Sequence, residues 1–204
     1  MTRPAAPATA GQERTSKGLE QFFAAIDGQE NLSIIDFGGA SQANISFITD
    51  LGHRLYADDV LRSVDQTFGT GEGARERQSD PDAIAQYLSQ NLTFHEASVG
   101  GALVWDTLQF LAPPLLEAIM QRLYTVMRPG AHLFAIFSAR EKATTASSYA
   151  YRITGSRTFT LSLRSERPVG QIFNNRSIEK LFQGWGSIKF FLTRDNFQEV
   201  LVRR

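Results

Sequence analysis

The apolar residues of this chain follow two alternating spacings. Apolar positions three and four residues apart predict helices with one buried stripe, and short, almost wholly apolar runs predict strands covered on both faces. The helical spacing begins near Ser16, Ser41, Pro81, Pro113 and Asn174, and the apolar runs cover 32–37, 53–57, 101–105 and 132–137. Strands that alternate with helices in this way predict an α/β fold with a doubly wound, mostly parallel sheet.

The last third of the chain has a different pattern. Segments 148–153 and 157–164, joined by a Thr-Gly-Ser turn, predict a β-hairpin inserted around 148–164. Segments 187–193 and 197–202 are separated by only three residues, so they must pair antiparallel and the sheet is predicted to end in an antiparallel hairpin. Because exposed strands invite pairing with another chain, the inserted hairpin is also a candidate surface for a homo-oligomer.

Length and charge limit the classes of protein to consider. The chain has 204 residues, with 21 Lys+Arg balanced by 21 Asp+Glu. This length predicts one domain over 15–204, preceded by a flexible Pro/Ala-rich tail over 1–14. A neutral chain has no electrostatic footprint for a polyanion, so nucleic acid is not expected as a partner. No apolar run has the length of a membrane span, and the start lacks a secretory signal.

The chain contains no cysteine. This excludes disulfides, thiolate metal sites and a cysteine nucleophile, and it fits a reducing compartment, so a cytoplasmic location is expected. His53, His95 and His132 are scattered and lack the spacing of metal ligands, so no metal is expected.

Acidic residues and a glycine pair lie at the carboxyl ends of the predicted strands. Asp36 and Gly38 close the first strand, Asp58 follows the second strand 22 residues after Asp36, and Asp106 follows strand 101–105. Ligands of open parallel sheets bind at this edge, where the strand order reverses. A glycine lets the backbone approach a ligand closely, and a carboxylate accepts two hydrogen bonds from a ribose diol. The sequence therefore predicts a ligand site at this edge.

Four segments together resemble class I S-adenosylmethionine-dependent methyltransferases. They are the run Ile-Ile-Asp-Phe-Gly-Gly-Ala-Ser-Gln from residue 34, the acid Asp58, the run Leu-Val-Trp-Asp-Thr-Leu-Gln-Phe-Leu from residue 103, and the Arg-Pro-Gly turn at 128–130 before a strand. The resemblance spans roughly residues 16–203. It implies a Rossmann-like methyltransferase fold, S-adenosylmethionine as the cofactor with S-adenosylhomocysteine as its product, and methyl transfer to an acceptor that the sequence does not identify.

The resemblance also implies roles for single residues. Asp36 and Gly38, with Gly39 beside them, match the first acid and glycine of the cofactor loop. Asp58 matches the acid that binds the ribose, and Asp59 is the alternative one residue later. Asp106 matches the polar position after the fourth strand, which lies near the methionine end of the cofactor or the acceptor. It is the candidate catalytic carboxylate, because it can orient the acceptor or take its proton.

The chain departs from the family pattern at three points. Ala40 and Gln42 stand where the loop of the family commonly has glycines, and no third strand with its usual acid is evident before residue 94. These losses count against a dinucleotide, whose pyrophosphate needs bare backbone at the helix N-terminus. They also favour an alternative to the enzyme, namely a catalytically inactive binding or assembly domain on the same scaffold.

Structural roles compete with each site assignment. Asp58 and Asp59 are also suited to cap the helix that follows them, and Asp106 to cap a short helix over 107–110. Trp105 is predicted to belong to the core rather than to stack on a substrate. Segment 68–82, rich in Gly, Glu, Arg and Ser, is predicted to be a mobile loop.

Overall fold

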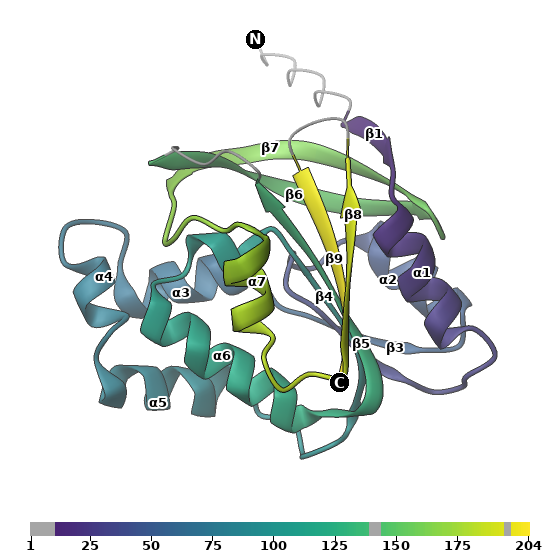
Figure 1. The fold of residues 1–204 in the computed structure, drawn as a ribbon, viewed down its shortest axis with the longest axis horizontal. Coiled ribbons are helices and arrows are strands. Elements are labelled where there is room, and N and C mark those ends of the chain that lie inside the picture. Colours follow the sequence, from purple (N-terminus) through teal and green to yellow (C-terminus); the bar gives the residue numbers. More distant parts are fainter. Residues whose placement is uncertain (1–10, 139–143, 194–196) are drawn as a thin grey trace, which may run out of the picture.

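The computed structural model describes residues 11–138, 144–193 and 197–204. Within these residues the chain forms a six-stranded sheet with helices on both faces, and a separate three-stranded sheet lies across one end of it (Figure 1). The predicted tail over 1–14 lies largely outside the described residues. Its last part does not match the prediction, because Gln12–Thr15 form strand β1.

The six-stranded sheet has the order β3-β2-β4-β5-β9-β8. Its strands are β2 (Ser33–Asp36), β3 (Arg54–Ala57), β4 (Val99–Trp105), β5 (Met127–Ser138), β8 (Ser187–Leu192) and β9 (Phe197–Arg203). The four strands from β3 to β5 pair in parallel, whereas β9 runs antiparallel to both β5 and β8. The predicted doubly wound, mostly parallel sheet with a closing antiparallel hairpin is therefore confirmed.

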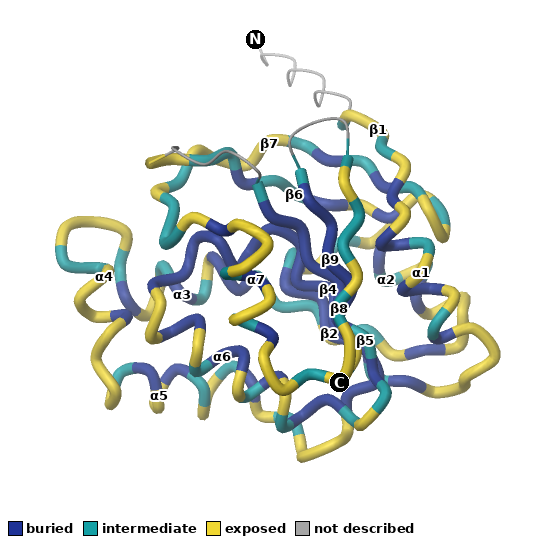
Figure 2. The backbone as a smooth tube through the Cα atoms, in the orientation of Figure 1, coloured by how far each residue is buried: buried dark blue, intermediate teal, exposed yellow. Residues whose placement is uncertain are grey.

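Alternate residues of the central strands supply two separate cores. Ile34 and Leu103 pack on one face with α1 (Lys17–Ile26) and α2 (Gln42–Asp50). The other face packs against helices α3 (Val60–Phe68), α5 (Pro81–Asn91), α6 (Pro113–Val126) and α7 (Asn175–Leu181). The central strands are buried on both faces, as parallel strands between helix layers must be (Figure 2).

Helix caps predicted from the sequence are present. The Ser16 hydroxyl accepts a hydrogen bond from the Leu19 amide at 2.9 Å and starts α1. Asn174 starts α7 through a capping box with Ser177. Pro81 occupies the first turn of α5, where its missing N–H removes no helical hydrogen bond.

The second sheet consists of β1, β7 (Thr158–Pro168) and β6 (Thr145–Gly155), in the order β1-β7-β6. The predicted hairpin is thus present but longer than 148–164 at both ends. β1 completes the sheet by pairing antiparallel with β7, and four largely exposed residues gave no apolar pattern from which to predict it. This second sheet crosses over the carboxyl ends of β4 and β5 (Figure 1).

Two local predictions were wrong. Segment 68–82 is not one loop, because it contains the short helix α4 (Ala74–Arg77) and the start of α5. Residues 128–130 are not a turn between helix and strand, because β5 begins already at Met127, which pairs with Val99 of β4. Among the described residues no strand lies between α3 and β4, as the sequence had indicated.

Candidate functional site

The predicted acids meet at the carboxyl rim of the six-stranded sheet. Asp36 ends β2, and the Asp58 amide after β3 donates a hydrogen bond to the Asp36 carbonyl at 2.9 Å. Gly38 and Asp59 form an isolated antiparallel bridge directly beyond these strands. Asp106 follows β4, which pairs with β2. The sheet topology therefore places the residues as the sequence predicted.

The Asp36 carboxylate is buried and fully engaged by the protein itself. One oxygen, Oδ1, accepts hydrogen bonds from the Gly38 amide at 2.8 Å and from the Trp105 indole Nε1 at 2.7 Å. The other oxygen, Oδ2, accepts from the Asn44 side-chain amide at 2.8 Å. Burial raises the pKa of Asp36, while these three donors act in the opposite direction. Both oxygens of Asp36 therefore have donors from within the chain.

Trp105 fills the space beside Gly38. Its indole is only 1% exposed and stacks on the ring of Tyr151 from β6, with centroids 4.6 Å apart and an interplanar angle of 7°. A Cβ atom built at Gly38 would lie 3.0 Å from the indole Cδ1. In this arrangement the indole of Trp105 packs directly against the loop at Gly38. The prediction that Trp105 belongs to the core is confirmed.

The glycine pair has a structural explanation in this closed arrangement. Gly38 lets the indole of Trp105 approach the loop backbone. Gly39 has a φ of +87°, a conformation that disfavours side chains, and a Cβ there would lie 3.2 Å from the Cβ of Asp59. Contacts within the chain therefore favour glycine at both positions, whether or not a ligand also uses them.

The two departures in the loop do not close the site. Ala40 and Gln42 are exposed, and the Gln42 side-chain amide donates to the Ser46 hydroxyl at 3.2 Å along the outside of α2. The closure comes from Trp105 and Tyr151, which sequence reasoning did not connect with the rim. A positive φ of 48° at Trp105 marks the place where β4 ends and the chain turns.

Asp58 and Asp59 have different surroundings. Asp58 is half-buried, and both burial and the charge of Asp59 raise its pKa. The carboxylate of Asp59 caps α3 by accepting from the Arg62 amide at 3.2 Å, and it also pairs with Arg164 of β7. The capping role predicted for this pair thus belongs to Asp59. Asp58 contributes to the raised pKa of Tyr87, which burial brings to about 12.

Asp106 is enclosed between the six-stranded sheet and the hairpin. It is 2% exposed, and its carboxylate accepts the Tyr149 amide of β6 at 3.3 Å. It does not cap the short 3-10 helix η1 (Thr107–Phe110) with its side chain. Burial raises the pKa of Asp106 to about 7, against the opposing effects of Tyr149 and Tyr151. The Tyr151 hydroxyl lies near this carboxylate without a hydrogen bond of good geometry among the described residues.

Replacing Asp106 with asparagine is expected to remove a pH dependence of stability. The pKa of Asp106 is about 7 in the folded protein and 3.8 ordinarily. Between these two pH values the folded protein keeps the proton on Asp106, whereas the unfolded chain has lost it. Stability therefore falls as pH rises from about 4 to about 7, by roughly 2–4 kcal/mol for a shift of this size. Asp106→Asn should match the wild type near pH 4 and exceed it by this amount at pH 8, in urea unfolding.

Asp50→Asn is the matched control for this measurement, because Asp50 is an exposed carboxylate at the end of α2. It should leave the slope of stability against pH unchanged. Parallel wild-type and Asp106→Asn curves between pH 5 and pH 8 would contradict the assignment of a raised pKa to Asp106.

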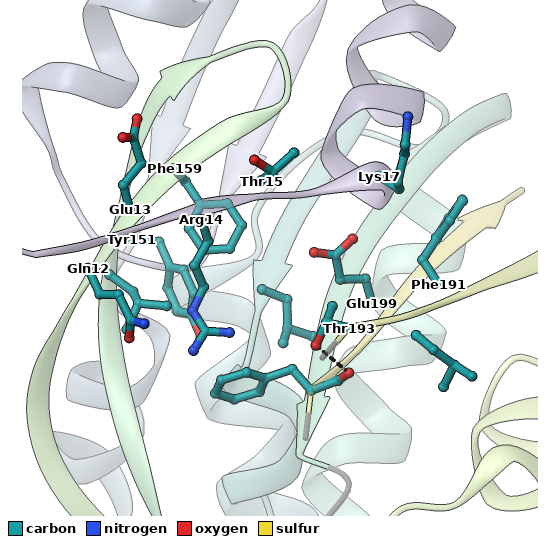
Figure 3. A pocket seen from close by; sticks show the side chains of 14 residues that line it. Gln12, Glu13, Arg14, Thr15, Lys17, Tyr151, Phe159, Phe191, Thr193 and Glu199 are labelled. Atoms are coloured by element: carbon teal, nitrogen blue, oxygen red, sulfur yellow. Dashed lines mark hydrogen bonds between the residues drawn. The ribbon is translucent and has the colours of Figure 1, made fainter. Parts of the chain in front are cut away.

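A cavity of about 400 Å³ lies between β1, the hairpin and the antiparallel end of the six-stranded sheet, and Tyr151 forms part of its wall (Figure 3). Aromatic rings of Tyr151, Phe159 and Phe197 line it. The guanidinium of Arg14 from β1 stands 4.8 Å above the ring of Phe197. Sequence reasoning did not find this cavity, because its wall from β1 lies in the part of the chain predicted to be a tail.

The floor of this cavity includes a buried carboxylate. Glu199 of β9 is 3% exposed and accepts the Gly18 amide at 2.8 Å, so it neutralises the N-terminus of α1. Burial raises its pKa, while Gly18, Ser16 and Arg14 favour the ionised form. Glu199 is thus committed to the fold, and the cavity has a mixed lining of apolar, aromatic and charged side chains.

Metal sites and membrane-spanning helices can be assessed only for the described residues. In the residues with described positions, no group of three or more His, Asp or Glu side chains is arranged to hold a metal. Within the same residues, no helix combines the length and hydropathy of a membrane span.

Comparisons with known proteins give likenesses in structure and none in sequence. No protein-family model and no curated protein matches the sequence. A SAM-dependent methyltransferase from Archaeoglobus fulgidus superposes with a TM-score of 0.51 at 10% identity, over 91% of this chain and 91% of that chain. A SAM-dependent methyltransferase from Methanosarcina mazei superposes with a TM-score of 0.49 at 13% identity, over 89% and 96%. The sheet order and the Archaeoglobus likeness together show that the chain has the fold of class I S-adenosylmethionine-dependent methyltransferases.

Proposed function

We propose that this chain binds S-adenosylmethionine at the carboxyl rim of its six-stranded sheet and transfers the methyl group to an acceptor of unidentified class. The observation that carries the proposal is the shared rim of Asp36, Gly38 and Asp58 at the ends of neighbouring parallel strands of a methyltransferase fold. Binding requires a form of the domain in which the Trp105 indole has left the loop.

The proposed site residues keep the roles that the sequence suggested. Asp36, Gly38 and Gly39 would form the cofactor loop, and Asp58 or Asp59 would bind the ribose. Their positions at one edge support this assignment, and Asp59 would first have to leave Arg164. Asp106 is the proposed acid–base carboxylate, because a pKa of about 7 lets it hold or release a proton near neutral pH.

A second candidate function is favoured by the closure of the rim. Trp105, Asn44 and the Gly38 amide all donate to the buried Asp36 carboxylate, as in a permanent core. The described chain also lacks the third strand whose acid the family uses. A non-catalytic binding or assembly domain with the methyltransferase fold accounts for both features.

Calorimetric titration with S-adenosylhomocysteine tests the proposed function. Because only the open form binds, the measured affinity is the intrinsic affinity reduced by the open fraction. Asp58→Ala should weaken binding by about 1–3 kcal/mol through lost hydrogen bonds to the ribose. Asp50→Ala, an exposed carboxylate away from the rim, should leave the affinity unchanged. A wild type that gives no heat of binding at millimolar ligand would support the second candidate instead.

A further inference from the structure

We propose that the three-stranded sheet β1-β7-β6 is an autoinhibitory lid over the rim, held down by two arginine–aspartate latches. The latches are Arg164 with Asp59 and Arg167 with Asp65. The inference concerns regulation of the proposed cofactor site and rests on that proposed function for its meaning. Opening of the lid can be measured without any ligand.

The underside of the lid is the reason that the rim is closed. Tyr151 of β6 stacks on Trp105 and holds the indole against the loop. Phe159 of β7 contacts the same indole edge-to-face, with centroids 5.7 Å apart. The lid thereby positions Trp105 where a ligand next to Gly38 would have to lie, and Trp105 acts as an internal competitor.

Asn44 of α2 joins the lid to the acid of the rim. Its side-chain oxygen accepts the Ile153 amide at 2.8 Å, and its Nδ2 donates to the Tyr151 carbonyl at 3.2 Å as well as to Asp36. β6 is an edge strand of its sheet, so Asn44 satisfies backbone groups that would otherwise be unpaired. Asn44 therefore contacts the lid and the Asp36 carboxylate at the same time.

The latches fasten the far strand of the hairpin to α3. The Arg164 guanidinium donates to both oxygens of Asp59, the longer contact being 3.3 Å, and Arg167 donates to both oxygens of Asp65, one contact being 2.8 Å. Two-point geometry of this kind fixes orientation as well as distance. All four side chains remain partly exposed, so water and salt can compete for them.

The lid can move without taking the six-stranded sheet apart. Its three strands pair only with one another, and the described strands of the two sheets share no ladder. Opening therefore breaks the Asn44 contacts, the aromatic stack, the latches and the Tyr149 contact with Asp106, and it exposes the apolar side chains of the lid that pack on the sheet, while the parallel ladders remain. The latches are the weakest and most accessible of these contacts. Their strength is therefore expected to set the fraction of molecules in which the lid is closed.

The test uses Trp105 as its own reporter. The chain has two tryptophans, so Trp185→Phe leaves Trp105 as the single tryptophan, which is excited selectively beyond the absorption of tyrosine. In this parent, Arg164→Ala/Arg167→Ala removes both latches. Arg152→Ala is the matched control, since Arg152 lies exposed on β6 of the same hairpin and forms no ion pair with the residues that the structure describes. Acrylamide quenching reports exposure of Trp105, and S-adenosylhomocysteine titration reports the ligand site.

Removing the latches is expected to raise the quenching constant severalfold and the apparent affinity for S-adenosylhomocysteine by about three- to tenfold. The control should match the parent in both. Increased quenching without any ligand binding would uphold the lid and remove the proposed function. Unchanged quenching in a folded unlatched variant would overturn the lid, whatever the titration shows.

A second arm keeps the test decisive if the unlatched variant does not fold. The parent protein should show rising quenching of Trp105 between 0.05 M and 1 M sodium chloride, on the order of twofold, because salt screens partly exposed pairs. The charge swap Arg167→Asp/Asp65→Arg should restore the quenching of the parent relative to Arg167→Asp alone. A flat salt response together with a failed swap would overturn the latch.

Discussion

Trp105→Ala is expected to lower the free energy of unfolding by about 3–5 kcal/mol, the range for a fully buried tryptophan. The indole packs against Tyr151, Phe134 and Phe159, and it donates the 2.7 Å hydrogen bond to Asp36. Its removal leaves a cavity between the two sheets and a buried carboxylate with one donor fewer. Urea unfolding at pH 7, followed by far-ultraviolet circular dichroism, measures the loss.

Trp105→Gly is the control. An alanine variant is usually more stable than a glycine variant, and here the opposite is expected. With a φ of 48°, position 105 strains any residue with a Cβ, and glycine adopts this conformation at no steric cost. Trp105→Gly should therefore be about 1 kcal/mol more stable than Trp105→Ala, although glycine is normally the more costly choice. A less stable glycine variant would show that the left-handed backbone at residue 105 does not persist in solution.

Asn44→Ala is expected to cost about 3–4 kcal/mol, far more than an asparagine on a helix surface. Asn44 is 1% exposed, and its amide serves Asp36 and the edge of β6 at the same time. Without it a buried carboxylate and a strand amide lose their partners, and each pays a desolvation cost. Denaturant unfolding gives the magnitude, and hydrogen exchange at the Ile153 amide should accelerate markedly.

Asn91→Ala is the matched control for Asn44. Asn91 also donates from its side chain to a backbone carbonyl, that of Tyr87, at 2.8 Å, but it lies half-buried at the end of α5. Its loss should cost no more than about 1 kcal/mol. Equal effects of the two replacements would contradict the view that Asn44 joins the lid to the rim.

The order of elements was predictable because it depends on short-range patterns. Apolar runs located β2 and β4, and caps such as Ser16 located helix starts to within a residue. The antiparallel end of the sheet followed from a three-residue connection, which no crossover can span. The common location of Asp36, Asp58 and Asp106 was then predictable as well, because the carboxyl ends of parallel strands lie at the same edge of a sheet.

The closure of the rim was not predictable from the sequence. The Arg164–Asp59 and Arg167–Asp65 pairs join residues more than 100 positions apart, and no local pattern connects them. Ala40 and Gln42 replace glycines of the family loop and could have obstructed a ligand, yet both side chains are exposed. The true obstruction is a residue predicted only as core, because which core a tryptophan joins depends on tertiary packing.

The central place of β9 has a consequence for biosynthesis. This strand is made after both of its neighbours, and yet it lies between β5 and β8 and pairs with each along most of its length. Until it emerges from the ribosome, the apolar edge of β5 has no partner and is open to pairing with other nascent chains. The edge of β5 is thus covered only after residues 197–203 have been made. Until then, we expect the nascent domain to need protection by chaperones.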